Sequence, residues 1–288
     1  MCEKHHLSRR QAAFLLCLAP ATLNYVECPR APEIQQQIAD ELRQLVDKHP
    51  AAGFKQCFHR LRRRGFMWNH KRVYRVYKLL GLNRRTRKKK RLPARVKRPL
   101  VTQHQPNAMW SMDFVHDQLA DGRSFRILNI MDDFNREIIA QEADTSLPAT
   151  RVIRVLERVC AEYGLPKAIR SDNGPEFVSH AMKRWCEQQG IDHQFIRPGK
   201  PTENAYVERS HRTLREELLN LFTFSTLHEV REHLWTWSED YNRHRPHSAL
   251  GYQTPIDLRR DYERLFSLKA SFLYSKPTGN SFSLSTFK

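Results

Sequence analysis

The sequence predicts a mixed α/β domain preceded by an all-α domain, and three patterns support this fold class. In the first third of the chain, apolar residues recur at helical spacing between prolines and glycines. Between residues 112 and 142, three short runs rich in Phe, Ile, Val and Leu are separated by turn residues, as in antiparallel strands. From about residue 148 to 222, helical patterns alternate with short apolar runs, which is typical of a sheet flanked by helices.

Length, charge and cysteine usage limit the class of protein. At about 150 residues per domain, 288 residues favour roughly two domains. The 49 Lys and Arg residues against 31 Asp and Glu give a net charge of +18, which favours nucleic acid as the partner. The longest apolar stretch, Ala12 to Ala19, is far shorter than the roughly 18 residues of a membrane span, so we expect no membrane protein. The 6 cysteines form no Cys-x-x-Cys pair, which favours reduced thiols and a cytoplasmic location.

Residues 1–83 are expected to form a helical DNA-binding region of helix-turn-helix type. Ser8 and Asn69 are suitable N-caps, and Gly81 is a suitable helix end. The outer faces are basic, as in DNA-binding helical bundles, and Lys71 and Arg72 are candidate DNA contacts. A solvated basic face without DNA contact is the alternative. Helices are expected at residues 8–18, 31–50, 53–65 and 69–81.

Residues 84–104 are expected to be a basic linker. Most positions from Arg84 to Arg98 carry Lys or Arg, and such self-repelling charge cannot pack into a core. It can neutralise phosphates and release counterions, which gives salt-dependent affinity without sequence preference. A solubilising spacer is the alternative. The candidate phosphate contacts are Arg84, Arg85, Arg87, Lys88, Lys89, Lys90 and Arg91.

The central region is expected to contain five strands and three helices. The first three strands are joined by tight turns and are therefore expected to be antiparallel. The fourth and fifth strands alternate with helices, which makes the sheet mixed. Strands are expected at residues 112–119, 124–131, 136–142, 167–171 and 191–196, and helices at 148–164, 182–189 and 203–222.

Three acidic residues in this region have the chemistry of a phosphodiester-processing site. Asp113 lies within the first strand, Asp172 directly follows the fourth, and Glu208 lies one turn into the last helix, so all three can meet at one sheet edge. Transfer of a phosphodiester requires neutralisation of the pentacovalent phosphate and an activated hydroxyl. Two divalent ions about 4 Å apart, held by carboxylates, provide both. Hard oxygen ligands suit Mg²⁺ or Mn²⁺.

Helical phase distinguishes Glu208 from the neighbouring Glu203. Asn204, Glu208, Arg212 and Arg215 share one helix face, whereas Glu203 points elsewhere. Glu208 is thus surrounded by groups suited to phosphate. The alternative is that Glu208 only pairs with Arg212 on a solvated face.

These motifs resemble a known family. Asp113, Asp172 and Glu208, the last two separated by 35 residues, resemble the DD(35)E triad of the retroviral-integrase superfamily. The strings around the triad resemble the second-frame (OrfB) transposase of bacterial IS3-family insertion sequences, and the resemblance covers about residues 7 to 260. The matching strings are residues 110–114, 171–177 and 199–209, the signature YNRHRPHSALGY at 241–252 with Thr254-Pro255, and the integrase-associated helix-turn-helix segment at about 31–83.

The resemblance implies an α/β RNase H-like core, a mixed five-stranded sheet with flanking helices, at residues 105–222, following the N-terminal all-α domain. The triad would bind two Mg²⁺ ions, which Mn²⁺ can replace. Water would then attack at the element end to free a 3′-OH, and that hydroxyl would attack another strand. Arg215, seven residues after Glu208, matches a basic residue that contacts terminal DNA, and Arg212 and Lys200 are further candidates.

The resemblance also implies partners and further segments. Partners would be the terminal inverted repeats and target DNA, further copies of the chain on DNA, and the first-frame (OrfA) product, separate or fused, with its leucine zipper. The location would be the bacterial cytoplasm, with the nucleoid when DNA is bound. Residues 223–265 are expected to form a C-terminal helical extension and residues 266–288 a disordered tail.

Other acidic residues and two other functions are alternatives to this interpretation. Asp117, Asp132, Asp133 and Glu176 are expected to serve turns and caps, although Asp132 can instead support the fold beside the site. The family usually has an aromatic residue near position 210, where this chain has Ser210-His211. The alternative function is a catalytically inactive DNA-binding remnant or regulator of transposition, which the intact triad disfavours. A ribonuclease acting on RNA–DNA hybrids is disfavoured by the basic N-terminal helices.

Overall fold

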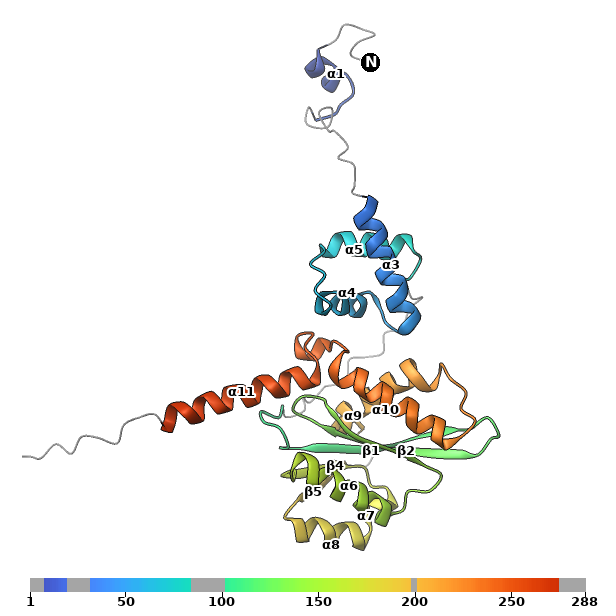
Figure 1. Ribbon diagram of the computed structural model, residues 1–288, viewed down its shortest axis with the longest axis vertical. Coiled ribbons are helices and arrows are strands. Elements are labelled where there is room, and N and C mark those ends of the chain that lie inside the picture. Colours follow the sequence, from blue (N-terminus) through green and yellow to red (C-terminus); the bar gives the residue numbers. More distant parts are fainter. Residues whose placement is uncertain (1–7, 20–31, 84–101, 198–200, 275–288) are drawn as a thin grey trace, which may run out of the picture.

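The computed structural model describes residues 8–19, 32–83, 102–197 and 201–274. These residues form a helical domain, a five-stranded α/β core and two C-terminal helices (Figure 1). In these ranges no helix is both long and apolar enough to span a membrane. Lys200, residues 84–101 with the basic candidates Arg84 to Arg91, and residues 275–288 lie outside the described residues.

The helical domain contains α3 (Pro32–Lys48), α4 (Phe54–Arg63) and α5 (His70–Leu79). Their apolar stripes meet in one buried cluster that includes Ile38, Leu42, Leu61, Val73 and Tyr77. The expected cap is present, because the Asn69 side chain accepts a hydrogen bond from the Lys71 N–H at 2.8 Å. Upstream, α1 (Arg9–Leu15) begins with a Ser8 capping box and ends earlier than the expected residue 18.

The sheet has the strand order β3-β2-β1-β4-β5. The strands are β1 (Trp110–Gln118), β2 (Ser124–Asp132), β3 (Ile138–Asp144), β4 (Ala168–Ser171) and β5 (Asp192–Phe195). Strands β1 to β3 are antiparallel, whereas β4 pairs in parallel with both β1 and β5. The mixed five-stranded sheet is confirmed. The third strand starts two residues later than expected because Arg136, at φ +62°, and Glu137 belong to the turn after β2.

Helices cover both faces of the sheet (Figure 1). One face packs against α6 (Ala149–Tyr163), α7 (Pro175–Val178) and α8 (His180–Gln189), with Met112 and Leu156 in its core. The other face packs against α9 (Ala205–Leu214) and α10 (Leu227–Arg243), with Val115 and Leu234 in its core. Because neighbouring residues of a strand point to opposite faces, β1 contributes to both cores.

The helix expected at residues 203–222 is divided into three segments in the structure. A 3₁₀ turn at Pro201–Asn204 precedes α9, and a π turn at Arg215–Leu219 follows it. A π turn holds one residue more than an α turn, so Leu218 and Leu219 both reach the buried cluster that Leu214 also joins. A regular helix would direct one of them away.

The C-terminal segment is fixed to the sheet by side chains. After α10, a 3₁₀ turn at Ser248–Leu250 leads to α11 (Pro255–Tyr274), which runs outward from the core (Figure 1). The buried Asn242 accepts from the N–H of Ile138 at 2.9 Å and donates to its carbonyl at 2.8 Å. The helix continues through residues 266–274, where a disordered tail was expected, because this stretch has no Pro or Gly and contains good helix formers.

We expect Asn242→Ala to lower the free energy of unfolding by about 2 kcal/mol, because it removes two hydrogen bonds and leaves the Ile138 peptide unpaired. Urea unfolding of the full chain measures this. Asn220→Ala is the control, since Asn220 is exposed. Equal stability of the two variants would contradict a role for Asn242 in closing the edge of β3.

Candidate active site

Asp113 lies on β1, the middle strand of the sheet. Alternation along the strand sends Met112 into the core beneath α6, and sends Asp113 and Val115 to the face covered by α9 and α10. The Asp113 side chain is 24% exposed. Its Oδ1 accepts a hydrogen bond from the Phe114 N–H at 2.8 Å, which fixes the orientation of the carboxylate.

Asp172 follows the carboxyl end of β4. The parallel register pairs Ser111 with Arg170, so its continuation by two residues brings Asp172 level with Asp113. Asp172 Oδ1 accepts from the N–H of Gly174 at 3.3 Å. A Cβ at position 174 would lie 3.2 Å from Asp172 Oδ1 and 3.4 Å from Glu176 Oε2, so glycine leaves both carboxylates their room.

Glu208 is the fourth residue of α9, and two buried side chains hold this helix against the sheet. Asn204 donates to the carbonyl of Met112 at 3.3 Å. Asn129 of β2 donates to Ser210 Oγ at 2.8 Å, so the position where the family usually has an aromatic residue makes a polar contact with the sheet. Glu203 pairs with Arg197 instead, because it lies in the 3₁₀ turn before α9 and not in the helix that carries Glu208.

Asp113 feels both burial and the charges of the other two carboxylates. Burial, followed by the negative charges of Asp172 and Glu208, raises the pKa of Asp113 to about 6, although the hydrogen bond from Phe114 opposes the change. Burial also raises the pKa of Glu208, which the positive charge of Arg212 opposes. The site is therefore rich in negative charge, and no Lys or Arg among the described residues forms an ion pair with Asp113.

His211 is a neighbour of Asp113 that the sequence did not identify as a site residue. Its Nδ1 lies 3.6 Å from Asp113 Oδ2. Burial and the charge of Arg215 lower the pKa of His211 to about 4, so the imidazole is neutral near pH 7. Its buried Nε2 has no hydrogen-bond partner among the described residues. No sequence pattern indicates this contact, because the two residues come from different elements.

The donor set fits a divalent metal in its chemistry. Two aspartates and one glutamate supply the hard oxygens that Mg²⁺ and Mn²⁺ prefer, and a cation would relieve the repulsion that raises the pKa of Asp113. Within the described ranges, no three His, Cys, Asp or Glu side chains already form a metal-binding group. The acidic group is thus an electrostatically coupled set, without the closed arrangement of a structural metal site.

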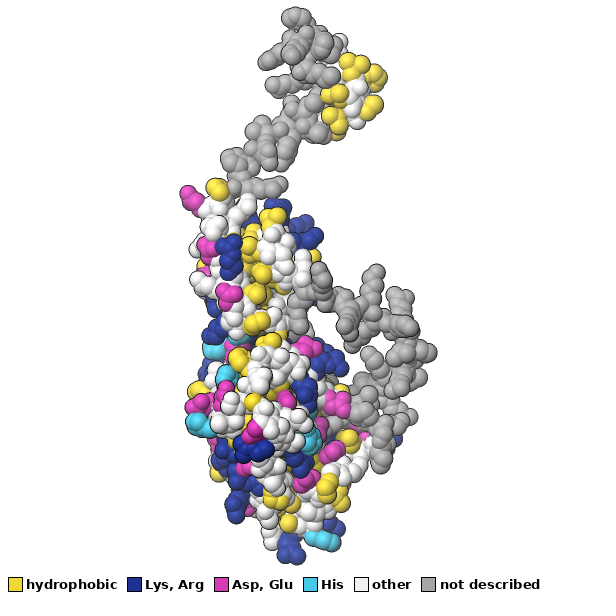
Figure 2. Space-filling model, turned by 90° about the vertical axis from the view of Figure 1, so that its right-hand side faces the viewer, with side chains coloured by type: hydrophobic (Ala, Val, Ile, Leu, Met, Phe, Trp, Pro, Cys, Tyr) yellow, Lys and Arg dark blue, Asp and Glu magenta, His cyan; other side chains and the backbone are white. Residues whose placement is uncertain are grey.

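The predicted DNA contacts fall in two places. Arg212 and Arg215 are exposed on the helix that carries Glu208, and Arg215 Nη2 donates to the carbonyl of His116 on β1 at 2.7 Å. Lys71 is exposed and Arg72 half-buried on α5, in the helical domain. Figure 2 shows Lys and Arg side chains on both the helical domain and the α/β core.

The other acidic residues near the strand ends have structural partners. Asp132 accepts from the N–H groups of Asn107 at 2.8 Å and Phe134 at 2.9 Å. Asp133 accepts from Ser111 Oγ at 2.6 Å and from Arg170 at 2.9 Å. The contact of Asp132 with Phe134 is the expected turn contact, whereas Asp133 bonds side chains of β1 and β4 in place of the turn or cap expected for it.

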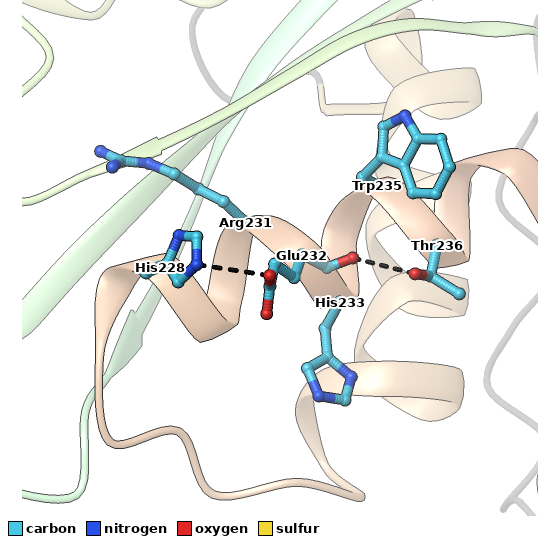
Figure 3. A pocket seen from close by; sticks show the side chains of 6 residues that line it. All are labelled: His228, Arg231, Glu232, His233, Trp235 and Thr236. Carbon is cyan, nitrogen blue, oxygen red and sulfur yellow. Dashed lines mark hydrogen bonds and ion pairs between the residues drawn. The ribbon is translucent and has the colours of Figure 1, made fainter.

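Glu176 forms an ion pair with Arg126 of β2, which the sequence did not single out. The guanidinium of Arg126 in turn lies 4.0 Å from the ring centroid of Phe114. A hollow along α10 is lined by residues of that helix alone and by none of the three acidic residues (Figure 3). In it, His228 Nε2 lies 3.3 Å from Glu232 Oε1.

Comparison with known proteins identifies this arrangement. Models of the integrase core domain match residues 103–201 and 189–255, and a model of an HTH-like domain matches residues 33–90. A chain in the cryo-EM structure of the simian T-cell lymphotropic virus intasome in complex with PP2A regulatory subunit B56 gamma has the same fold. Its TM-score is 0.50 at 18% identity, over 77% of this chain and 74% of that chain. The fold and the matching models define an integrase core joined to an HTH-like domain.

Two curated relatives come from bacterial insertion elements. The insertion element IS407 uncharacterized 31.7 kDa protein of Burkholderia multivorans is 35% identical over 270 residues, 94% of this chain and 97% of that protein. The transposase for insertion sequence element IS904 of Lactococcus lactis is 27% identical over 247 residues, 81% of this chain and 97% of that protein. The chain therefore belongs to the insertion-element transposases with an integrase core, which confirms the resemblance found in the motifs.

We expect Asp113→Asn to stabilise the metal-free protein at pH 8 and to lose that advantage as the pH falls to about 4. The pKa of Asp113 is raised in the folded state, so the folded state binds the proton more tightly. The free-energy cost of ionising Asp113 in the folded state is absent below pH 3.8, its ordinary pKa, and complete above about pH 6. A pKa change of this size corresponds to about 3 kcal/mol. Urea unfolding in chelator at several pH values measures it.

Asp117→Asn is the control for this experiment, because it makes the same substitution on the same strand outside the acidic group. An effect of Asp113→Asn that is independent of pH would contradict the raised pKa of Asp113.

Proposed function

We propose that this chain catalyses Mg²⁺-dependent DNA cleavage and strand transfer at the ends of an insertion sequence of the IS3 type. The observation that carries the proposal is the acidic group: Asp113, Asp172 and Glu208 are electrostatically coupled on one side of an integrase-type sheet. Burial and the two neighbouring carboxylates raise the pKa of Asp113, and perturbed pKa values of this kind are frequent at functional sites such as divalent-metal sites.

In this proposal the three carboxylates hold the metal. The bound metal would supply charge neutralisation at phosphorus and a more acidic attacking hydroxyl. Asp113, fixed by the Phe114 N–H, and Asp172, fixed by the Gly174 N–H, offer their second oxygens to the metal. Water first cleaves the phosphodiester at the element end and leaves a 3′-OH. That hydroxyl then attacks a phosphodiester of the target, forms the new strand and releases a target 3′-OH.

Basic residues beside the acidic group and on the helical domain would bind the DNA. Arg212 and Arg215 would contact phosphates beside the acidic group, and Lys71 and Arg72 would contact DNA from the helical domain. Lys200 and the basic run 84–91 are proposed as further phosphate contacts. The partners would be terminal inverted repeats and target DNA, further copies of the chain, and the first-frame (OrfA) product. Such a protein acts in the bacterial cytoplasm.

We expect Asp113→Asn, Asp172→Asn and Glu208→Gln each to lower strand transfer by about 10³-fold or more, because each removes one ligand of the proposed metal site. DNA retention should stay within about twofold of wild type, since binding comes mainly from basic residues. Labelled element-end duplexes measure joining on gels, and filter binding measures retention.

Glu203→Gln is the matched control and should keep its activity, because Glu203 pairs with Arg197 outside the acidic group. An active Glu208→Gln protein would refute the assignment of the triad. A wild-type chain that retains DNA without cleaving or joining it, alone and with the first-frame product, would support the alternative of an inactive DNA-binding remnant or regulator.

We expect Mg²⁺ to raise the melting temperature of the wild-type chain, because a cation that binds only the folded state shifts unfolding by mass action. Asp113→Asn and Asp172→Asn should lose this shift, whereas Asp192→Asn, on the exposed β5, should retain it. Differential scanning fluorimetry without DNA measures the effect. An equal Mg²⁺ response in all four proteins would contradict metal binding by the acidic group.

A further inference from the structure

The basic face of α4 lies against the end of α10, the segment that follows it and the start of α11, although some 180 residues of sequence separate them. Arg60 makes a two-point ion pair with Asp240, from Nη1 to Oδ1 at 3.0 Å and from Nη2 to Oδ2 at 2.5 Å. Arg60 is only 7% exposed. One turn along, Arg63 Nη1 lies 2.5 Å from Asp257 Oδ2. This face of α4 is therefore occupied by carboxylates of the same chain.

An aromatic contact completes the interface. The rings of His59 and Tyr252 stack at 3.5 Å between centroids, with an angle of 11° between their planes. His49, at the end of α3, also lies 3.8 Å from Asp240 through its Nε2. Ion pairs and ring stacking along the same helix give the contact a defined geometry, unlike a loose electrostatic attraction.

The segment that receives α4 is rigidly attached to the catalytic core. Arg245 makes a two-point ion pair with Glu217, and His247 bonds through Nε2 to the Tyr241 carbonyl at 3.1 Å. Asn242 pairs with the backbone of β3. The YNRHRPH signature thus builds the platform on which α4 lies, and most of its polar side chains are engaged with protein.

The next helix, α5, has the opposite character. Lys71, Arg75 and Lys78 are exposed, and among the described residues none has a carboxylate partner. The other arginine of α4, Arg62, donates to the Trp68 carbonyl at 2.9 Å, and Arg64, directly after the helix, pairs with Glu41 at 3.0 Å. Phosphate contacts require exposed cations whose charge is not already neutralised.

We propose that α4 is a docking helix that binds the C-terminal extension of the same chain, and that α5 presents the DNA-binding face of the helical domain. The DNA half rests on the proposed function, whereas the docking half does not. Docking holds α5 in a fixed position relative to Asp113, so DNA bound at α5 and the acidic group belong to one rigid unit. Arg60 cannot reach a phosphate while it pairs with Asp240.

Charge exchange at the buried pair tests the docking. Arg60→Asp and Asp240→Arg each place like charges opposite one another, so each should raise amide hydrogen exchange in α4 by at least tenfold. The double variant restores opposite charges at the same net charge and should recover most of the protection. The more exposed pair Arg63–Asp257 provides a second exchange if the first single variants do not fold. Absence of recovery in both double variants would overturn the docking.

A DNA-binding measurement tests whether α5 presents the DNA-binding face. In the Asp113→Asn background, with a random-sequence duplex as the probe, Lys71→Ala and Lys78→Ala should each lower the salt dependence of log affinity by about one. The Arg60→Asp/Asp240→Arg variant should keep the wild-type affinity and slope. A loss of affinity in the exchange variant with unchanged α5 variants would assign DNA to α4. A chain that binds no duplex would refute the DNA half and leave the hydrogen-exchange result to decide docking.

Discussion

The arrangement of the site depends on the position of β1 between an antiparallel and a parallel neighbour. β1 pairs with β2 in antiparallel register along its whole length. Its parallel pairing with β4 brings Asp172, at the end of β4, level with Asp113. A parallel pair requires a crossover, which α6 provides across one face of the sheet. The other face is left for α9. Two acidic residues that are distant in sequence therefore meet because of strand pairing.

The third acidic residue is placed by a polar contact inside an apolar interface. Ser210 and Asn129 are both buried and bond to each other, which fixes the rotation of α9 on the sheet. Loss of this bond would leave the buried Nδ2 of Asn129 without its partner, which costs free energy, so the bond favours one rotation of the helix. The result is that Glu208 adds its charge near Asp113. Burial of the extensive apolar cores on both faces of the sheet offsets the free-energy cost of placing this charge near Asp113.

The high positive charge of the chain serves two purposes. A net charge of +18 suits a protein that binds nucleic acid, but many arginines form ion pairs within the protein. Arg60 and Arg245 tie α4 and the C-terminal segment to carboxylates, whereas α5 keeps exposed cations without carboxylate partners in the described structure. The distinction between structural and DNA-binding charge thus follows from burial and pairing, and composition alone does not reveal it.

The sequence by itself determined the local features: the helix caps at Ser8 and Asn69 and the strand order along the chain. These depend on neighbours within a few residues, so periodicity and capping patterns predict them. Tertiary structure decided the π turn after α9, the contact of His211 with Asp113 and the pairing of Arg60 with Asp240. Most of these depend on which distant surfaces meet, and a charged residue carries no mark of its partner when 180 positions separate the two.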